Sequence, residues 1–515
     1  MSDIRVSECV GSELSRRDAL RVLGAGGTAA WLAMHGEAVA ASQAEASPVQ
    51  IPDSGAQLPT DPVDFHWMDS GDAKALFFNA YFSAYMQAHP NITVRYETFP
   101  FAQLGETITA GVQNGNAPDV FQLPGSIPAP EVIREGWVAA IDDLIPDFEA
   151  WKSVFPPGSF FEGFNQYEGK TYSFPITKST GYTTLTYSNT AYMQAAGFDP
   201  SMPLTLDEFR AACRKITEQG EGNYFGLMIG AKEGAQLAAF VERLAWMDTI
   251  ASDFDWRTGT WNYTSDQYLA TIELLLALKA DGSIFPGASS MNAPQTRAQF
   301  PQGQAGILLD GTYAIPGWRK DNPEFDFGVA GQPTPNSGNI TPTSRGLGVT
   351  GSNLMWMYAE SENKAIAGDM FHYIGSPEGN AAFTRLSGGG QPSIYPENNE
   401  DPSIDPRSQL ALRIVNDQTR LGPMPEIRNP EVSRVNLESR ALTPTIAEVI
   451  QGIFVGQISD PRAAMQDLAD RSQRELERSI KAAQDKGAQV SFDDWIFPNW
   501  DPAQDYTEDD YAALR

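Results

Sequence analysis

Hydrophobic positions in the first half of the chain follow two patterns. Some form short apolar runs, and others recur at helical spacing over longer stretches. Strands are predicted over residues 63–67 and 92–97, where β-branched and aromatic residues gather. Between them, residues 73–88 place apolar side chains three and four positions apart, which predicts a helix. A helix over 101–114 and a strand over 119–123 repeat the unit. Strands and helices that alternate in this way predict a parallel sheet flanked by helices.

The same alternation returns further along the chain. Thr205 and Glu208 form a capping-box pattern, in which each side chain can pair with an exposed backbone donor, so a helix is predicted to begin there. A second helix is predicted over 265–279, and strands over 305–309 and 327–329. The pattern therefore predicts a second α/β region after the first.

The N-terminal segment has the order of an export signal. Residues 15–21 contain the Arg-Arg pair, residues 22–34 form an apolar run too short and glycine-rich to span a bilayer, and residues 38–40 are small. We interpret residues 1–40 as a twin-arginine-type signal peptide, with Ala19 standing where the usual pattern prefers Phe. This interpretation places the mature protein in the periplasm or outside the cell.

Composition narrows the class of protein. Residues 41–62 are rich in Ala, Ser, Gln and Pro without periodicity, which predicts a flexible lead-in. The remaining chain is too long for one compact core and suggests two or three domains. Cys213 is the single cysteine after the signal, so no internal disulfide is expected. The net charge of −29 disfavours nucleic acid and anionic membranes as partners.

Seven short motifs follow one another between about residues 63 and 476. They are the strand at 63–67, the helix-to-strand step at 85–96, N-A-P-D-V-F-Q at 116–122, Y-E-G-K-T-Y-S-F-P at 167–175, L-T-Y-S-N at 185–189, the G-Q-A-G to D-G-T-Y stretch at 303–313, and S-P-E at 376–378. This order resembles the extracellular solute-binding proteins of ABC importers, in the branch that binds sugars and oligosaccharides. Each motif is weak alone, whereas seven in the right order are specific.

The resemblance implies an α/β fold of the two-lobed periplasmic-binding-protein type, with crossing hinge strands and a cleft between the lobes. Lobe one would hold residues 63–177 and 329–374, and lobe two residues 178–328 and 375–515. The lobes would close on the ligand, and an ABC permease in the membrane would recognise the closed state of this monomeric receptor. Sites in open α/β sheets lie beyond the carboxyl ends of the strands, which agrees with a cleft there.

Sugar recognition needs aromatic faces over the ring and polar groups for the hydroxyls. We therefore expect ligand contacts from residues near strand ends, apolar helices or glycine turns: Trp67, Asp69, Gln122, Tyr187, Trp246, Tyr313, Asn353, Trp356 and Gln391. Trp246 and Trp356 fit a core position equally well, because aromatic residues in apolar stretches are usually buried. Arg345 and Lys178 would favour an anionic ligand if they faced the cleft.

The main alternative is a secreted carbohydrate-active enzyme of the glycoside hydrolase kind. Such an enzyme needs two carboxylates across the scissile bond, and 65 acidic residues do not exclude that pair. The sequence contains no Gly-x-Ser-x-Gly elbow, no His-Glu-x-x-His helix and no phosphate-binding glycine loop. We therefore predict a non-enzymatic binder without metal or cofactor. Its ligand is a sugar or oligosaccharide or, alternatively, a polyol or glycerol phosphate ester.

Overall fold

The computed structural model describes residues 49–514, with short gaps at 72, 125–126, 128, 179–183, 233 and 346–352. The chain divides into a unit formed by Met1–Pro48 and a unit formed by Val49–Arg515. The signal peptide predicted over residues 1–40 lies outside the described residues. Within the described part of the chain, no helix combines the length and the apolar character that a membrane crossing needs.

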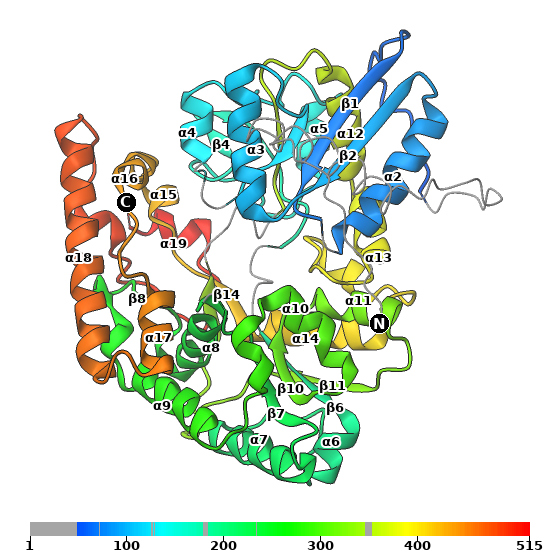
Figure 1. Cartoon of the computed structure of the whole chain (residues 1–515). Helices are drawn as coiled ribbons and strands as arrows, with labels where there is room; N and C mark the ends of the chain where they lie inside the picture. The colour runs from blue at the N-terminus through cyan, green and yellow to red at the C-terminus, as the bar shows by residue number, and fades with distance from the viewer. Residues whose placement is uncertain are drawn as a thin grey trace, which may run out of the picture. The chain divides into compact units, whose positions relative to one another are not determined.

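The first sheet has four strands in the order β13-β3-β1-β2, and Figure 1 labels β1 and β2. β1 (Val63–Asp69) pairs in parallel with β2 (Ile92–Thr98) on one side and β3 (Val120–Gln122) on the other. β13 (Met355–Met357) pairs antiparallel to β3 and comes from far along the chain. The three parallel strands confirm the α/β pattern predicted for the first part of the sequence.

Aromatic side chains of α2 (Lys74–Ala88) form much of the core on this sheet. Helix α2 runs alongside β1 and β2 (Figure 1), and its Phe77, Phe78, Tyr81 and Phe82 are buried. The helical spacing of these residues turns them toward one side of the helix. Helices α3 (Phe101–Asn114), α12 (Lys364–Ile374) and α13 (Pro377–Leu386) complete the elements around the first sheet.

The second sheet is mixed, with the order β11-β6-β10-β7. β10 (Ala305–Asp310) pairs in parallel with β7 (Phe225–Met228) and antiparallel with β6 (Leu185–Asn189). β11 (Phe327–Gly331) also pairs antiparallel with β6. The sheet is mixed because β6 runs antiparallel to both of its neighbours.

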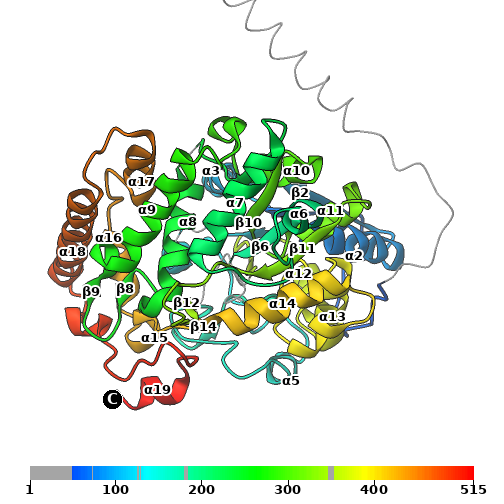
Figure 2. The same cartoon turned by 90° about the horizontal axis from the view of Figure 1, so that it is seen from below.

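Four helices pack around the second sheet and its neighbourhood, and Figure 2 shows three of them, α7, α8 and α9, side by side. They are α7 (Leu206–Gly220), α8 (Ala235–Ala245), α9 (Asp266–Ala280) and α14 (Pro406–Gln418). Helix α7 begins with the predicted capping box, in which Thr205 Oγ1 accepts from Glu208 N–H and the Glu208 carboxylate accepts from Thr205 N–H. Gly226 of β7 lets this helix approach closely, since a Cβ there would lie 2.4 Å from the Cα of Cys213.

The remaining elements are short apart from one C-terminal helix. They are α4 (Ala129–Arg134), α5 (Phe148–Ser153), β4 (Gln166–Tyr167), β5 (Lys170–Thr171), α6 (Thr190–Ala195), the π-helical turn η2 (Trp246–Ile250), β8 (Phe254–Asp255), β9 (Thr260–Trp261), α10 (Ala293–Gln299), α11 (Ala314–Asp321), β12 (Thr343–Arg345), β14 (Thr419–Leu421), α15 (Pro425–Arg428), α16 (Val432–Glu438), α17 (Ile446–Val455), α18 (Pro461–Asp485), α19 (Glu508–Ala512), and the 3-10 turns η3 (Asn262–Thr264), η4 (Pro286–Ser290), η5 (Phe300–Gln302), η6 (Pro396–Glu400) and η7 (Phe492–Trp495).

The chain returns from the second sheet to the first later than residue 329, where the sequence analysis placed the boundary between the lobes. Residues 329–331 belong to β11 and are hydrogen-bonded into the second sheet, and the chain returns to the first sheet at β13. Phe383 of α13 is buried in the core of the first sheet, although the division at 375 assigned it to lobe two. The sequence predicted that a helix begins at Ser376, but it did not predict that this helix packs on the first sheet.

The lead-in is ordered from Val49 onward, so its prediction as flexible is wrong for the described residues. Val49 is 3% exposed and belongs to the core of the first sheet. Ser54 Oγ donates to Asp369 Oδ1, and Asn91 Nδ2 donates to the carbonyl of Pro59 at 2.8 Å. Isolated apolar and hydroxyl groups hold this segment, which explains why it shows no periodicity.

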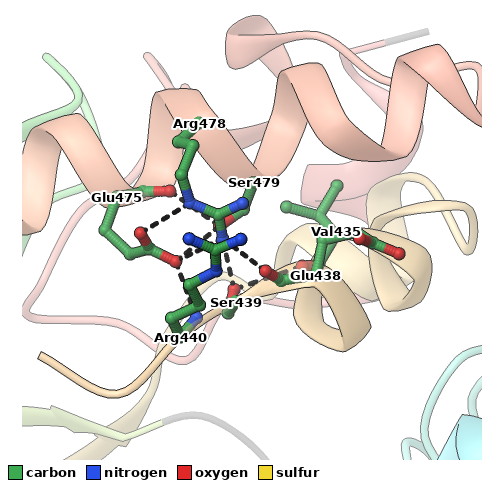
Figure 3. Close-up of polar contacts among 7 residues, drawn as sticks. All are labelled: Val435, Glu438, Ser439, Arg440, Glu475, Arg478 and Ser479. Carbon is green, nitrogen blue, oxygen red and sulfur yellow. Dashed lines mark hydrogen bonds and ion pairs between the residues drawn. The ribbon is translucent and has the colours of Figure 1, made fainter.

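Helix α18 is fixed to the end of α16 by a group of polar contacts (Figure 3). Arg478 Nε and Nη2 donate to the two carboxylate oxygens of Glu475 at 2.8 and 2.6 Å, and Nη2 also donates to the carbonyl of Glu438. The backbone N–H of Arg440 donates to Glu475 Oε1 at 2.6 Å. These hydrogen bonds join two helices and the turn that follows α16.

The C-terminal segment after α18 packs on the rest of the unit rather than extending from it. Phe497, Trp500, Tyr506 and Tyr511 are buried together. Phe497 N–H donates to the carbonyl of Trp256 at 2.6 Å, and Tyr511 OH accepts from the N–H of Met424 at 2.9 Å. Helix α19 therefore lies beside α15 (Figures 1 and 2), as a strap over the surface.

Candidate functional site

Two of the predicted site residues, Gln122 and Asn353, meet beyond the carboxyl ends of the first sheet. Gln122 ends β3, and its Nε2 donates to Asn353 Oδ1 at 3.2 Å while its Oε1 accepts from Ser70 N–H at 3.2 Å. Asn353 Nδ2 donates in turn to Thr177 Oγ1 at 3.0 Å. All these side chains except that of Ser70 are buried. The network joins the ends of two strands to Thr177, close to the point where the chain leaves the first sheet.

Asp69 ends β1 beside this network. Its Oδ1 accepts from Gly71 N–H at 2.6 Å and from Tyr96 OH at 3.0 Å. Lys74 Nζ lies 3.9 Å from Asp69 Oδ1 and donates to Ser70 Oγ at 2.5 Å. Burial raises the pKa of Asp69, and the Lys74 ammonium opposes this rise. The cation at this sheet end is therefore already compensated by a carboxylate.

The end of the second sheet carries a similar ion pair. Arg297 Nε donates to Asp310 Oδ2 at 2.8 Å, and its guanidinium carbon lies 4.4 Å from the ring centroid of Tyr313. Asp310 Oδ1 accepts from Gly311 N–H at 2.8 Å. A cavity of about 20 Å³, lined among others by Asp310 and Arg243, opens beside them and has room for about one water molecule. Tyr313 is half-buried, with the guanidinium over its ring.

Gln391 follows a glycine turn that touches elements of both sheets. Thr312 Oγ1 donates to the carbonyl of Gly390 at 2.9 Å. A Cβ at Gly390 would lie 2.7 Å from the Cβ of Ala73, next to α2, and 3.2 Å from Pro316 of α11. Gln391 itself is buried. The turn is thus packed tightly between the start of α2 and α11, and is more than a mobile loop.

Trp246 lies at the end of α8 with charged groups on either side. Its Nε1 donates to Asp253 Oδ1 at 2.7 Å, and the guanidinium carbon of Arg345 lies 5.3 Å from its ring. Tyr268 OH also donates to Asp253 Oδ1. Burial and the Asp253 charge raise the pKa of Glu242 to about 8, while nearby arginines oppose the rise.

A pocket of about 320 Å³ opens next to Trp246. Its aromatic walls are Trp246, Phe254, Trp256, Trp261 and Trp495, and Asp253 lines it as well. Sequence reasoning selected only Trp246 from this set. The other pocket residues could have been selected from the sequence, because the Phe254 to Trp261 hairpin and the C-terminal segment both place tryptophans in otherwise polar stretches.

Three predicted contacts belong to the core and are corrected. Trp67 is fully buried, with its ring 5.1 Å from that of Phe78. Tyr187 is fully buried against Trp318 at 4.9 Å and donates its hydroxyl to the Gly311 carbonyl. Trp356 is fully buried in a third apolar cluster. These rings pack inside apolar clusters and are part of the core, whereas the equally buried Asp69 and Gln122 take part in the hydrogen-bond network at the strand ends.

A cavity of about 480 Å³ elsewhere in the unit is lined by none of the nine predicted residues. Its walls include Pro156, Phe161 and Tyr506, with Lys178 and several acidic residues around them. Lys178 Nζ donates to Asn416 Oδ1 at 3.2 Å. We place the candidate site at the sheet ends instead, because convergent polar groups are found there. Within the described residues, no cluster of His, Cys, Asp and Glu has the composition of a metal site.

Comparison with known proteins agrees with this geometry. Residues 71–381 match the family described as bacterial extracellular solute-binding protein. A protein of Brucella abortus (strain 2308), named only as a binding protein, is 25% identical over 334 residues, 64% of this chain and 74% of its own length.

Solved structures show the same fold at low sequence identity. The GacH receptor of Streptomyces glaucescens has a TM-score of 0.60 at 19% identity, covering 80% of this chain and 98% of the receptor. The sugar-binding protein MalE of Xanthomonas citri has a TM-score of 0.56 at 17% identity, covering 83% and 100%. The predicted two-lobed α/β periplasmic-binding-protein fold is thereby confirmed. Because the family match spans more than half of the chain, this protein belongs to the bacterial extracellular solute-binding protein family, whose members are receptors and not enzymes.

Proposed function

We propose that this protein is the exported substrate-binding receptor of an ABC importer, and that it binds an uncharged sugar or oligosaccharide by closure of its lobes. The pairing of cations at the sheet ends is the observation that carries the proposal. Lys74 lies by Asp69, Arg297 is paired with Asp310, and Arg345 interacts electrostatically with Asp253. Compensated cations and buried amides suit hydroxyl groups better than an anionic ester.

The solved neighbours support the same ligand class. The GacH receptor was crystallised with acarbose, and solute-binding proteins of Thermotoga lettingae and Agrobacterium vitis were crystallised with α-D-tagatose and D-mannitol. Sugar and polyol ligands thus occur on this fold, and a polyol is the second candidate for this chain. The glycerol phosphate ester ranks below both, because Lys74 and Arg297 at the sheet ends lie beside carboxylates and Lys178 donates to Asn416 Oδ1.

The proposal assigns the ligand contacts to Asp69, Gln122, Asn353, Tyr313, Gln391 and Trp246. It includes export through the twin-arginine-type signal of residues 1–40, a periplasmic or extracellular location, and a monomer that engages a membrane permease. It also places lobe one at residues 49–177 with 353–386, and lobe two at 184–345 with 406–514. The core residues of the two sheets support these boundaries.

A thermal-shift screen of the mature protein tests this function. Mono-, di- and oligosaccharides, polyols and phosphorylated polyols are added separately, and each ligand is then recovered and analysed for breakdown. A melting temperature raised by a narrow group of uncharged saccharides, with the ligand intact, is the expected result, since a ligand stabilises the state that binds it. A rise only with phosphorylated polyols would contradict the uncharged ligand.

A further inference from the structure

A buried threonine stands at each end of the first crossing between the lobes, residues 178–183. Thr177 precedes the crossing, and Thr184 follows it and directly precedes β6; their exposed fractions are 0% and 6%. A buried hydroxyl needs a hydrogen-bond partner, and each of these threonines is paired with a side-chain amide. Thr177 Oγ1 accepts from Asn353 Nδ2 at 3.0 Å, and Thr184 Oγ1 donates to Gln332 Oε1 at 2.8 Å.

The threonine–amide pair of the second lobe lies at the sheet edge where β10 ends. In the antiparallel ladders, Leu185 pairs with Asp310 on one side and with Gly331 on the other. Thr184 precedes Leu185 and Gln332 follows Gly331, so this pair continues the ladder beyond the carboxyl end of β11. Thr184 also lines the small cavity to which Asp310 belongs. The pair therefore adjoins the strand end that carries proposed ligand contacts.

Each amide is hydrogen-bonded in turn to an element on the ligand side of its lobe. Gln332 Nε2 donates at 3.1 Å to the carbonyl of Arg243 in α8, the helix that Trp246 ends. Asn353 Oδ1 accepts at 3.2 Å from Gln122, which ends β3. The two lobes therefore repeat one arrangement, in which two successive hydrogen bonds join an end of the crossing to a ligand-side element.

A nearby threonine shows what a purely structural hydroxyl of this strand does. Thr186 lies two positions beyond Thr184, is also buried, and donates its hydroxyl to the carbonyl of Gly331 at 2.8 Å. That bond joins two strands that the backbone ladder already pairs. Thr184, in contrast, is joined through Gln332 to α8, an element outside the sheet. Displacing Thr184 would leave a buried amide oxygen without this donor, so the pair resists displacement.

We propose that Thr184 and Gln332 are positioning residues of the second lobe, which hold the end of the first crossing in a fixed relation to the ligand-side elements, as Thr177 and Asn353 do in the first lobe. This inference rests on the proposed function, in which the lobes close on a ligand. Lobes held at both ends of the crossing adopt fewer arrangements before the ligand binds, so closure loses little conformational entropy. With one end released, that entropy is lost on binding, and the affinity falls.

Double electron–electron resonance on the mature protein tests the positioning role without any ligand. Spin labels are placed at Gln113→Cys in α3 and Glu273→Cys in α9, which are exposed, whereas the native Cys213 is fully buried. We expect Thr184→Val, which removes the hydroxyl and keeps the shape, to broaden the distribution of distances between the lobes. The matched control Thr186→Val should keep the wild-type width, although both variants lower the urea midpoint. Thr184→Ser, which keeps the hydroxyl, should restore the width.

Isothermal titration with maltose, maltotriose, D-tagatose and D-mannitol adds the binding measurement. For a probe that binds the wild-type protein, we expect Thr184→Val to weaken binding about threefold to tenfold, the range of one lost hydrogen bond, and Thr186→Val to leave it unchanged. Gln332→Met, which interrupts the same connection at its other residue, should reproduce both effects of Thr184→Val.

The outcomes separate the positioning role from the function on which it rests. A wild-type width or a wild-type affinity in Thr184→Val and Gln332→Met, or equal effects in Thr186→Val, would overturn the positioning role and leave the sugar-binding function standing. Absence of binding by all four probes in the wild-type protein would count against the sugar and polyol function, and the width of the distance distribution would still decide the positioning role.

Discussion

At the scale of single residues, Asn353 links two other buried residues of the candidate site. It joins Gln122 and Thr177, and its backbone has a φ of +50°, which few side chains other than Asn tolerate well. Asn353→Ala leaves two buried polar groups without this partner, so we expect the free energy of unfolding to fall by about 1–3 kcal/mol. Urea denaturation measures this loss, and ligand affinity should fall with it.

The matched variant Asn353→Gly separates the loss of side-chain hydrogen bonds from the strain of a positive φ as causes of destabilisation. Glycine accepts the positive φ without strain but makes no side-chain hydrogen bonds. If backbone strain dominated, Asn353→Gly would be close to the wild-type protein in stability. We expect instead that it loses nearly as much as Asn353→Ala, because unpaired buried amides and hydroxyls dominate the cost.

Glu242 gives the receptor a pH dependence of stability. Its pKa of about 8 in the folded state exceeds its ordinary value of 4.5, so the folded protein binds more protons between these values than the unfolded chain. The stabilisation is complete below pH 4.5 and is lost as the pH rises through 8. We expect urea midpoints to fall from pH 5.5 to pH 8.5.

Glu242→Gln should flatten this profile, because its side chain does not titrate. A shallow slope of the same sign should remain, since burial also raises the pKa of Asp253. An unchanged slope in Glu242→Gln would assign the pH dependence to another group.

The positions of site residues were predictable from the sequence where they depend on neighbouring residues in the chain. Asp69 and Gln122 were placed at strand ends because a strand is recognised by its period, and its last residue follows from that. The fate of Trp67 and Trp356 was not predictable in this way. Which face of a strand meets a helix depends on packing between segments distant in sequence, and the period alone does not identify that face.

At the scale of elements, the contact between α18 and α16 depends on the Glu475 and Arg478 pair. Hydrogen bonding to Arg478 lowers the pKa of Glu475 to about 2, so the carboxylate contributes stability above its ordinary value of 4.5 and loses it as the pH falls toward 2. Arg478→Ala should lower the free energy of unfolding by about 1 kcal/mol at neutral pH, since a bidentate pair is stronger than a typical surface pair.

Arg474→Ala is the matched control, because Arg474 is exposed on the same helix and carries the same charge. Both variants are compared by urea denaturation at pH 7 and pH 3. The difference between them should shrink at pH 3, where Glu475 begins to lose its charge. An equal effect of both variants at pH 7 would mean that net charge, and not the pair, sets the stability.

The elements themselves were largely predictable, and their partners were not. The capping box at Thr205 and the alternation around β1 depend on neighbours in sequence, which is why both were recognised. The membership of β11 in the second sheet and of α13 in the first core depends on where the chain crosses between sheets. The segments that cross between the sheets have no hydrophobic periodicity, so the sequence did not predict where they cross.

At the scale of the whole molecule, the two sheets each bring polar groups to a strand end, and the chain crosses between them close to those groups. Thr177 precedes one crossing and is hydrogen-bonded to Asn353, which follows another. A ligand bound to this network would therefore bias the segments that join the lobes. This coupling is what a receptor that signals by closure requires.

The start of the folded unit at Val49 gives the final prediction. Val49 is 3% exposed in the first core, and Ser54 donates to Asp369, whose second carboxylate oxygen accepts from Tyr85 OH at 2.6 Å. A chain that begins at Val49 keeps these contacts, whereas one that begins at Asp61 loses a buried side chain and a hydrogen bond to a charged group. Each contributes about 1.5–3 kcal/mol, so together we expect a loss of about 3 kcal/mol or more. Urea denaturation of the two truncated chains measures it, and equal midpoints would show that the segment merely lies on the surface.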